Sequence, residues 1–284
     1  MVNTKKIAVI GAGTMGIQIS QVAALNGFQV VLKSRNSASI RSGLKHIGEN
    51  LQRCLEKKRI TLDESKTALD RIIGTTSFSE IGKDVDIVIE SIIENVDVKK
   101  KLFKKITKVC SSSAIISSNT SSLSITELAS SVELPQRFIG LHFFNPATTI
   151  ELVEIVKGRL TSPETCESIE NFARNLKKTP IILNDSPGFL VNRMLIPAIN
   201  EAIIILEAGT ASKEDIDLSI KLGAKHPMGT LELADLIGLD VCLNLMESLF
   251  AQFNTAKYRP CPLLIKMVKM KHLGRKTKRG FYQY

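Results

Sequence analysis

The sequence contains no tryptophan, and aromatic residues make up only 5% of its 284 residues. Proteins that bind nucleic acids combine clustered basic residues with aromatic rings on which bases stack. Here the basic residues are spread along the chain and are not interleaved with such rings. The composition therefore argues against a nucleic-acid-binding protein.

Long hydrophobic runs are also lacking. The longest apolar runs, such as residues 202–206, are far shorter than the roughly 20 residues that a membrane-spanning helix needs. The chain begins Met-Val-Asn-Thr-Lys-Lys, which lacks the apolar core of a signal peptide. We therefore expect a cytoplasmic protein that does not bind membranes.

Cysteines are few and scattered. The five cysteines form no C-x-x-C pair and have no nearby histidine at the spacing of a metal site. They are Cys54, Cys110, Cys166, Cys242 and Cys261. We expect free, mostly buried thiols and no bound metal ion.

The charge balance is basic, with 38 Lys and Arg against 28 Asp and Glu and a net charge of +10. A lysine-coated surface that keeps the protein in solution is one explanation, and a phosphate-rich ligand is the other. Because nucleic acid is disfavoured, a polyanionic metabolite fits best among the ligands.

A glycine-rich loop follows the first strand-like run. Residues 6–10 are β-branched and apolar, residues 16–26 have the apolar spacing of a helix, and residues 28–32 form a second buried run. The loop reads Gly11-Ala12-Gly13-Thr14-Met15-Gly16. In a G-x-G-x-x-G loop the glycines permit the tight turn, the approach of a pyrophosphate and close helix packing, and the helix N-terminus favours the phosphates. We therefore predict a dinucleotide-binding βαβ unit.

The end of the second strand bears on which dinucleotide binds. An NAD-specific site normally carries Asp or Glu there, to accept hydrogen bonds from the ribose hydroxyls. This strand ends Leu32-Lys33-Ser34-Arg35, without a carboxylate. Ser34 can donate to a 2′-phosphate and Arg35 can pair with its oxygens, so we favour NADP(H). The alternative is an exposed Arg35 and a site that accepts NAD as well.

Strands and helices alternate up to residue 184. We expect a long helix at residues 37–58, followed by a shorter helix that ends near residue 72. Further helices are expected at residues 98–109, 125–130 and 163–177, and strands at residues 86–90, 114–117, 137–143, 152–156 and 180–183. This alternation predicts an α/β fold with a Rossmann-type, doubly wound and mostly parallel sheet.

The pattern changes at Asn184-Asp185-Ser186-Pro187-Gly188. Only helical patterns follow, at residues 189–207, 213–222, 231–252 and 263–270. We predict a dinucleotide-binding domain of residues 1–185 and an all-α domain of residues 186–284 for substrate binding and dimerisation. A small helical domain of this kind often buries its apolar faces against a second copy, so we expect a homodimer.

His142 is the candidate acid or base. It lies late in a predicted strand, and ligand sites gather at the carboxyl ends of strands in open α/β sheets. Hydride transfer from an alcohol requires a base for the hydroxyl proton, and histidine suits this near neutral pH. Glu154, in the next strand-like segment, is a candidate to hold the second ring nitrogen.

Several longer motifs are more specific than the glycine loop. They are Ser118-Asn119-Thr120-Ser121-Ser122, Gly140-Leu141-His142-Phe143-Phe144-Asn145-Pro146, Leu152-Val153-Glu154 and Ser186-Pro187-Gly188-Phe189-Leu190-Val191-Asn192-Arg193. Together they resemble the L-3-hydroxyacyl-CoA dehydrogenases, most closely the bacterial 3-hydroxybutyryl-CoA dehydrogenases. The resemblance covers nearly the whole chain.

The resemblance implies roles for individual residues. His142 would be the acid/base at the substrate's 3-oxygen and Glu154 its orienting carboxylate, while Ser121 and Asn192 would bind the substrate's oxygens. It places Glu94, Lys99, Asn119 and Asn145 near the ribose and nicotinamide of the cofactor. It also suggests Asn50 and Lys57, on the helix after the second strand, as contacts of CoA, although a solvated helix face explains these two equally well.

The implied reaction is hydride transfer between NAD(P)(H) and C3 of a short acyl-CoA, interconverting 3-hydroxybutyryl-CoA and acetoacetyl-CoA. Two alternatives stay open: a dehydrogenase of a non-CoA hydroxy acid on the same fold, and a non-enzymatic crystallin-like protein. The sequence departs from the resemblance at Ser34, where relatives carry Asp, at residues 147–151 and at Thr230. These departures concern cofactor choice and the acyl pocket.

Overall fold

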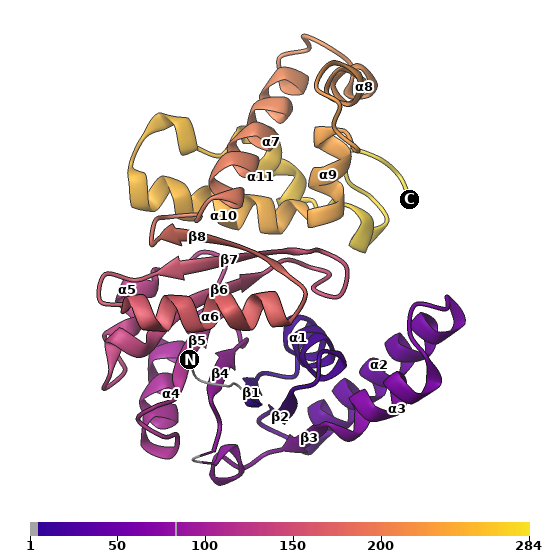
Figure 1. Cartoon of the computed structure of the whole chain (residues 1–284). Coiled ribbons are helices and arrows are strands. Elements are labelled where there is room, and N and C mark those ends of the chain that lie inside the picture. Colours follow the sequence, from indigo (N-terminus) through magenta and orange to yellow (C-terminus); the bar gives the residue numbers. More distant parts are fainter. Residues whose placement is uncertain (1–4, 83) are drawn as a thin grey trace. The chain divides into compact units, whose positions relative to one another are not determined.

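The computed structural model describes residues 5–82 and 84–284. Residues 1–4, on which part of the expectation about a signal peptide rests, lie outside this described part. The chain divides into two compact units, one ending at Asp185 and one running from Ser186 to Tyr284 (Figure 1).

An eight-stranded sheet forms the centre of the first unit, with the order β3-β2-β1-β4-β5-β6-β7-β8. Its strands are β1 (Lys6–Ile10), β2 (Gln29–Lys33), β3 (Ile72–Thr75), β4 (Ile87–Glu90), β5 (Ile115–Ser118), β6 (Phe138–Phe143), β7 (Leu152–Lys157) and β8 (Thr179–Asn184). Neighbouring strands are parallel except β6 and β7, which pair antiparallel. The expectation of a doubly wound, mostly parallel sheet is confirmed.

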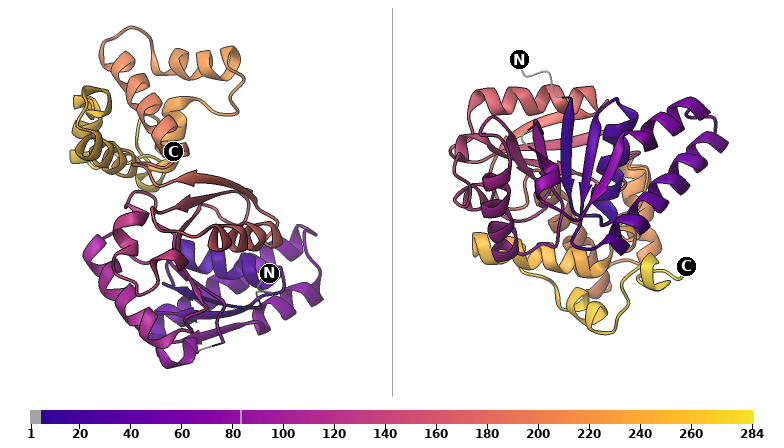
Figure 2. Two further views of the ribbon diagram at one scale, coloured as in Figure 1. Left: turned by 60° about the vertical axis from the view of Figure 1, so that its left-hand side comes forward. Right: turned by 90° about the horizontal axis from the view of Figure 1, so that it is seen from below.

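Helices cover both faces of this sheet (Figures 1 and 2). They are α1 (Thr14–Leu25), α2 (Ser37–Glu56), α3 (Leu62–Asp70), α4 (Val96–Val109), α5 (Ile125–Ala129) and α6 (Pro163–Asn175). Helices α1 and α6 share one core, in which Phe28 packs edge-on against Phe172. On the other face Phe103 of α4 packs against Phe138 of β6. Because side chains alternate along a strand, β6 contributes Phe138 to one core and Ile139 to the other.

Local side chains fix where several helices begin. Asn36 accepts a hydrogen bond from the Ser39 N–H at the start of α2, and Asn95 caps α4 in the same way. Thr61 and Glu64 form a reciprocal capping box at the start of α3. Helices α2 and α3 then run side by side away from the sheet (Figure 2).

The second unit consists of helices α7 (Val191–Glu207), α8 (Lys213–Gly223), α9 (Thr230–Ile237), α10 (Leu239–Phe253) and α11 (Pro262–Lys269). They enclose a separate apolar core that includes Ile199, Met246 and Leu264. The Asp235 carboxylate accepts hydrogen bonds from the N–H groups of Phe281 and Tyr282, which ties the C-terminal segment to α9.

Two expectations about elements are wrong. Strand β3 occupies residues for which no strand is expected, and residues 231–252 form two helices instead of one. The break falls at Gly238, whose φ of +105° lies in a region that L side chains rarely adopt. The spacing of apolar residues does not reveal this change of backbone direction, so the amphipathic pattern predicts one continuous helix.

The cysteines are free, with Cys166, Cys242 and Cys261 buried and Cys54 and Cys110 partly buried. Burial raises the pKa of Cys110 to about 11 and that of Cys242 to about 12, which makes both unreactive as nucleophiles near neutral pH. Among the described residues no cluster of His, Cys, Asp and Glu could hold a metal ion. Within the same part of the chain, every helix is too short or too polar to cross a membrane.

Candidate active site

The glycine loop joins β1 to α1 and has the geometry of a phosphate cradle. Gly11 has φ +119°, and a Cβ there would lie 2.1 Å from the Ser91 carbonyl oxygen. A Cβ on Gly16 would lie 1.8 Å from the Gly11 carbonyl oxygen. A Cβ on Gly13 would meet nothing within 4 Å, so the loop is open to a ligand at that residue. Thr14 and Met15 begin α1, whose N-terminal N–H groups favour an anion.

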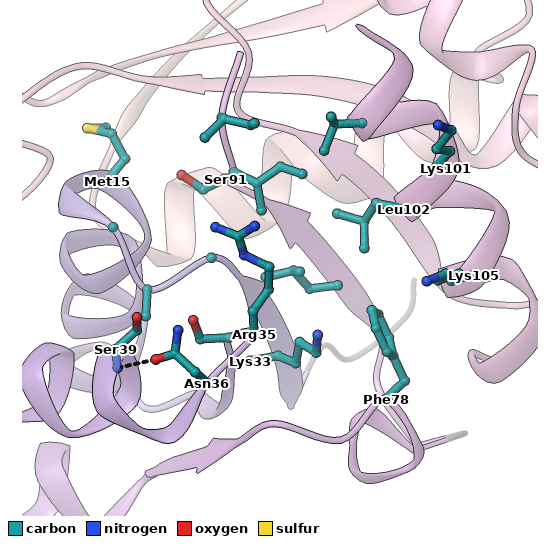
Figure 3. Close-up of a pocket in the computed structure, with 18 of the residues that line it drawn as sticks. Met15, Lys33, Arg35, Asn36, Ser39, Phe78, Ser91, Lys101, Leu102 and Lys105 are labelled. Carbon is teal, nitrogen blue, oxygen red and sulfur yellow. Dashed lines mark hydrogen bonds between the residues drawn. The ribbon is translucent and has the colours of Figure 1, made fainter. Parts of the chain in front are cut away.

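A pocket of about 690 Å³ adjoins this loop (Figure 3). It is lined by residues 10–15 from the glycine loop, residues 33–36 from the end of β2, and Leu102 of α4. Its volume lies within the range of about 300–1,000 Å³ that is usual for cofactor pockets. The chain's own residues thus fit a dinucleotide.

Basic side chains dominate one side of this pocket. Arg35 points into it, and Lys33, Lys101 and Lys105 line it as well (Figure 3). The described residues that line it include no Asp or Glu, and none of the four cations forms an ion pair within the described part of the chain. Burial lowers the pKa of Lys33, and the nearby charges of Lys105 and Arg35 lower it further.

Lys33 is the buried member of this group of basic pocket residues. Its side chain is only 6% exposed, and its ammonium lies 3.8 Å from the centre of the Phe78 ring. Ser34 follows it, with its N–H donating to the Thr75 carbonyl of β3 at 3.0 Å. The missed strand β3 therefore fixes the backbone at the end of β2, where Rossmann folds usually contact the ribose.

His142 and Glu154 are brought together by the antiparallel pairing of β6 and β7. They are direct cross-strand partners. The Nδ1–H of His142 donates to Oε2 of Glu154 at 2.7 Å, and the glutamate side chain is fully buried. A buried carboxylate in this position fixes the tautomer and ring orientation of the histidine.

Two asparagines tie the neighbouring loops together. The Asn119 side-chain oxygen accepts a hydrogen bond from the Phe143 N–H at 2.8 Å, which links the end of β5 to the end of β6. The Asn145 side-chain oxygen accepts from Nε2 of Gln18 at 3.2 Å. Gln18 also accepts from the Ala147 N–H, so α1 holds the loop after β6.

Glu94 organises the loop that carries Ser121. Its Oε1 accepts hydrogen bonds from the N–H groups of Ser121 at 2.9 Å and Ser122 at 3.2 Å, and from the Thr120 hydroxyl. Burial alone would raise the pKa of Glu94, but Lys99 and these hydrogen bonds outweigh it and lower the pKa from its ordinary value. Glu94 therefore stays an anion and can hold the loop.

Lys99 is almost completely buried and is paired with two carboxylates. Its side chain is 1% exposed, and its ammonium donates to Oε1 of the fully buried Glu90 at 2.5 Å. It lies 3.3 Å from Oε2 of Glu94. The sequence analysis did not single out four charged residues of this region: Lys33, Glu90, Lys101 and Lys105. A signal was present for two of them, because the spacing of Lys101 and Lys105 places both on one face of a helix.

The remaining expected residues lie on helices. Asn192 is the second residue of α7, in the second unit. Asn50 lies on α2, and Lys57, which has an exposed side chain, directly follows the last residue of that helix. Their roles stay predictions.

The whole chain matches known proteins. Residues 6–186 match the family model of the NAD-binding domain of 3-hydroxyacyl-CoA dehydrogenases, and residues 188–284 match that of the C-terminal domain. A 3-hydroxybutyryl-CoA dehydrogenase of Bradyrhizobium diazoefficiens is 48% identical over 99% of this chain and 95% of its own length. One of Clostridioides difficile is 46% identical over 98% of this chain and 99% of its own length.

Solved structures give the same result. The crystal structure of (S)-3-hydroxybutyryl-CoA dehydrogenase from Ralstonia eutropha has a TM-score of 0.96 and 45% identity, and the match covers 99% of both chains. With both family domains matched in order, this protein belongs to the 3-hydroxyacyl-CoA dehydrogenase family.

Proposed function

We propose that this protein is a 3-hydroxybutyryl-CoA dehydrogenase that interconverts L-3-hydroxybutyryl-CoA and acetoacetyl-CoA. The observation that carries the proposal is the buried His142–Glu154 pair. With Nδ1 bonded to Glu154, the proton exchanged with the substrate's 3-oxygen passes through Nε2 of His142. The names of the similar bacterial enzymes support the four-carbon substrate.

A nicotinamide cofactor in the glycine-loop pocket would accept the hydride from C3 or supply it. The chain's residues prepare the site for this reaction. The glycine loop and α1 bind the phosphates, His142 moves the proton, and Ser121 and Asn192 hold the substrate's oxygens. Glu94, Lys99, Asn119 and Asn145 serve the cofactor side of the site, and Asn50 and Lys57 are the proposed CoA contacts.

An assay with acetoacetyl-CoA and NADPH or NADH, followed by the loss of absorbance of the reduced cofactor, tests the substrate. Rapid oxidation supports the proposal. Activity on a free hydroxy acid or oxo acid but silence with acyl-CoA would replace it with the first alternative, a non-CoA dehydrogenase. No activity on either would favour a non-enzymatic role.

NADP(H) is the proposed cofactor. Ser34 stands where an NAD-specific site has a carboxylate, and Arg35 points into the pocket beside it (Figure 3). Lys33, Lys101 and Lys105 add positive charge to a pocket whose described lining offers no carboxylate. A 2′-phosphate carries the charge and acceptor oxygens that such a cluster binds.

We further propose a homodimer formed through the helical unit. This unit exposes large apolar side chains, among them Met194 at 69% and Leu222 at 67%. Leu218 and Leu222 are one helical turn apart on α8, so they share a face. Burying such a face against a second copy removes apolar surface from water.

A further inference from the structure

The net positive charge of the chain comes almost entirely from residues 248–284. All 28 Asp and Glu lie within the first 247 residues, whereas nine of the 38 Lys and Arg follow Glu247. The first 247 residues are therefore almost neutral, and residues 248–284 carry only positive charge. A lysine coat that keeps the protein in solution needs no such concentration. This distribution is typical of a surface that meets an anionic partner.

All nine of these basic side chains are exposed to solvent. Arg275 pairs with Glu232 at 2.9 Å, and Lys276 pairs with Asp240. The other seven form no ion pair with any residue that the structure describes. Five of the seven are close together in the sequence, and we call them the C-terminal basic patch: Lys266, Lys269, Lys271, Lys278 and Arg279.

Helix α11 and the turn after it carry this patch, within the second unit (Figure 1). Lys266 and Lys269 lie on α11 and Met270 directly follows it, with spacings of three and four residues that put the three side chains on one face. The chain then folds back on itself, because Gly274 and Arg279 form an antiparallel bridge. Met270 is 51% exposed. The patch therefore presents an apolar side chain among unpaired cations.

We propose that the C-terminal basic patch binds the surface of an anionic lipid bilayer. Its ammonium and guanidinium groups contact the phosphates of the headgroups, and Met270 reaches the apolar boundary beneath them. Such binding needs neither a membrane-spanning helix nor a signal peptide, the two features whose absence led to the expectation of no membrane binding. The proposal is also independent of the proposed function, because it involves none of the residues assigned to the reaction.

Two other polyanions fit the patch less well. Interfaces between proteins are depleted in lysine, whereas four of the five patch cations are lysines. Single-stranded nucleic acids stack their bases on aromatic rings. Of residues 248–284, all of which the structure describes, Tyr284 is the exposed aromatic, and its hydroxyl already donates to Asp235 at 3.2 Å. Lipid headgroups require only positive charge at the surface, which lysines supply.

Co-sedimentation of the full-length protein with lipid vesicles tests the proposal. One set of vesicles is phosphatidylcholine alone, and the other contains phosphatidylglycerol as about one third of the lipid. The patch variant combines Lys269→Gln, Lys271→Gln and Lys278→Gln. A second variant, Met270→Gln, keeps every charge. Because these side chains are exposed, both variants should keep the wild-type Tm.

A matched control removes the same charge from the first unit, by combining Lys66→Gln, Lys104→Gln and Lys177→Gln. These lysines are also exposed and form no ion pair with a described residue. Lys177 matches Lys278 in backbone conformation, since their φ angles are +57° and +58°. The control therefore has the net charge of the patch variant but an intact patch.

We expect the wild type to bind the vesicles that contain phosphatidylglycerol and not those of phosphatidylcholine alone, with an affinity that falls as salt is added. Each Lys or Arg near an anionic surface strengthens binding by roughly five-fold. The patch variant should therefore bind about 100-fold more weakly, whereas the control should bind like the wild type. Met270→Gln should bind a few-fold more weakly at every salt concentration, because salt does not screen an apolar contact.

Failure of the wild type to bind the anionic vesicles would overturn the proposal. An equal loss by the control would also overturn it, because the overall charge of the protein would then be the cause. Unchanged binding by Met270→Gln would remove Met270 from the contact. Single-stranded RNA and polyglutamate, at the same concentration of negative charge as the vesicles, serve as competitors. If either displaces the protein completely, the patch prefers nucleic acid or an acidic protein, and the assignment to lipid is wrong.

Discussion

Nδ1 of His142 and Oε2 of Glu154 lie 2.7 Å apart on directly paired residues of two antiparallel strands. The hydrogen bonds of the two strands therefore set the distance between the acid/base and its orienting carboxylate. Neither residue depends on a loop for its position.

Substituting either member of this pair should abolish most turnover. We expect His142→Ala and Glu154→Gln each to lower kcat by at least about 100-fold, because the proton transfer at the 3-oxygen loses its catalyst or its orientation. Cofactor affinity should stay nearly unchanged, since neither residue lines the cofactor pocket. Steady-state kinetics and cofactor titration measure the two effects, and a kcat like that of the wild type would remove the assigned roles.

Cofactor preference should reverse when the end of β2 is changed. Ser34→Asp combined with Arg35→Ala removes a cation and adds the carboxylate of an NAD site, so the ratio of kcat/KM for NADPH to that for NADH should fall by about ten-fold or more. Lys105→Ala should lower the ratio less. Lys104→Ala, exposed on the same helix but outside the pocket lining, serves as its control. A wild type that prefers NADH would refute the NADP(H) assignment.

NADPH binding should depend on pH through Lys33. Because its pKa is lowered by burial and by Lys105 and Arg35, Lys33 loses its charge at a lower pH than an ordinary lysine. NADPH affinity should therefore decrease as the pH rises toward that lowered pKa, whereas NADH affinity should change little. Titrations across alkaline pH measure this, and Lys33→Met should remove the dependence. Equal pH profiles for the two cofactors would contradict it.

The glycine loop offers a test that separates folding from binding. Gly16→Ala would place a Cβ 1.8 Å from the Gly11 carbonyl oxygen, so it should lower the free energy of unfolding by about 1–3 kcal/mol. Gly13→Ala meets no protein atom within 4 Å and should leave Tm unchanged while it weakens cofactor binding. Thermal melts and cofactor titration check both, and tight binding by Gly13→Ala would show that the pyrophosphate does not approach there.

The oligomeric state is open to direct measurement. Gel filtration with light scattering should give the mass of a dimer for the wild type. Leu222→Lys places a charge on the exposed apolar face of α8 and should shift the equilibrium toward monomer. A monomeric wild type would exclude the homodimer.

Much of this protein could be predicted because hydrophobic periodicity and a few motifs report the elements directly. The glycine loop, the order of strands and helices and the His142–Glu154 pair all follow from local patterns. Strand β3 was not predicted, because it has four residues, one of them a glycine, and its stability comes from pairing with β2. The break between α9 and α10 was not predicted either, because it depends on the backbone conformation at Gly238.

The ionic part of the site was harder to foresee, since it depends on contacts that are distant in sequence. Glu90 reads as the end of a buried strand, yet its oxygens reach Lys99 on α4 and Ser118 on β5. Lys105 reads as one of several lysines on an amphipathic helix, and only the fold brings it near Lys33. A sequence pattern gives the face of a helix but not what that face meets.

The reversal of strand direction at β7 has a consequence for how such enzymes diversify. The acid/base pair belongs to four directly paired residues of β6 and β7, whereas the intervening segment, residues 144–151, is anchored separately by Gln18 and by Lys178, which donates to the Ala147 and Ile150 carbonyls. These contacts are made to backbone groups, so the exposed side chains of Thr148 and Thr149 can vary without moving the two strands, whereas the ring of Phe144 lies 4.5 Å from that of His142 and is tied to the acid/base pair. Sequence change can thus accumulate at the tip of this segment while the paired strands keep the chemistry.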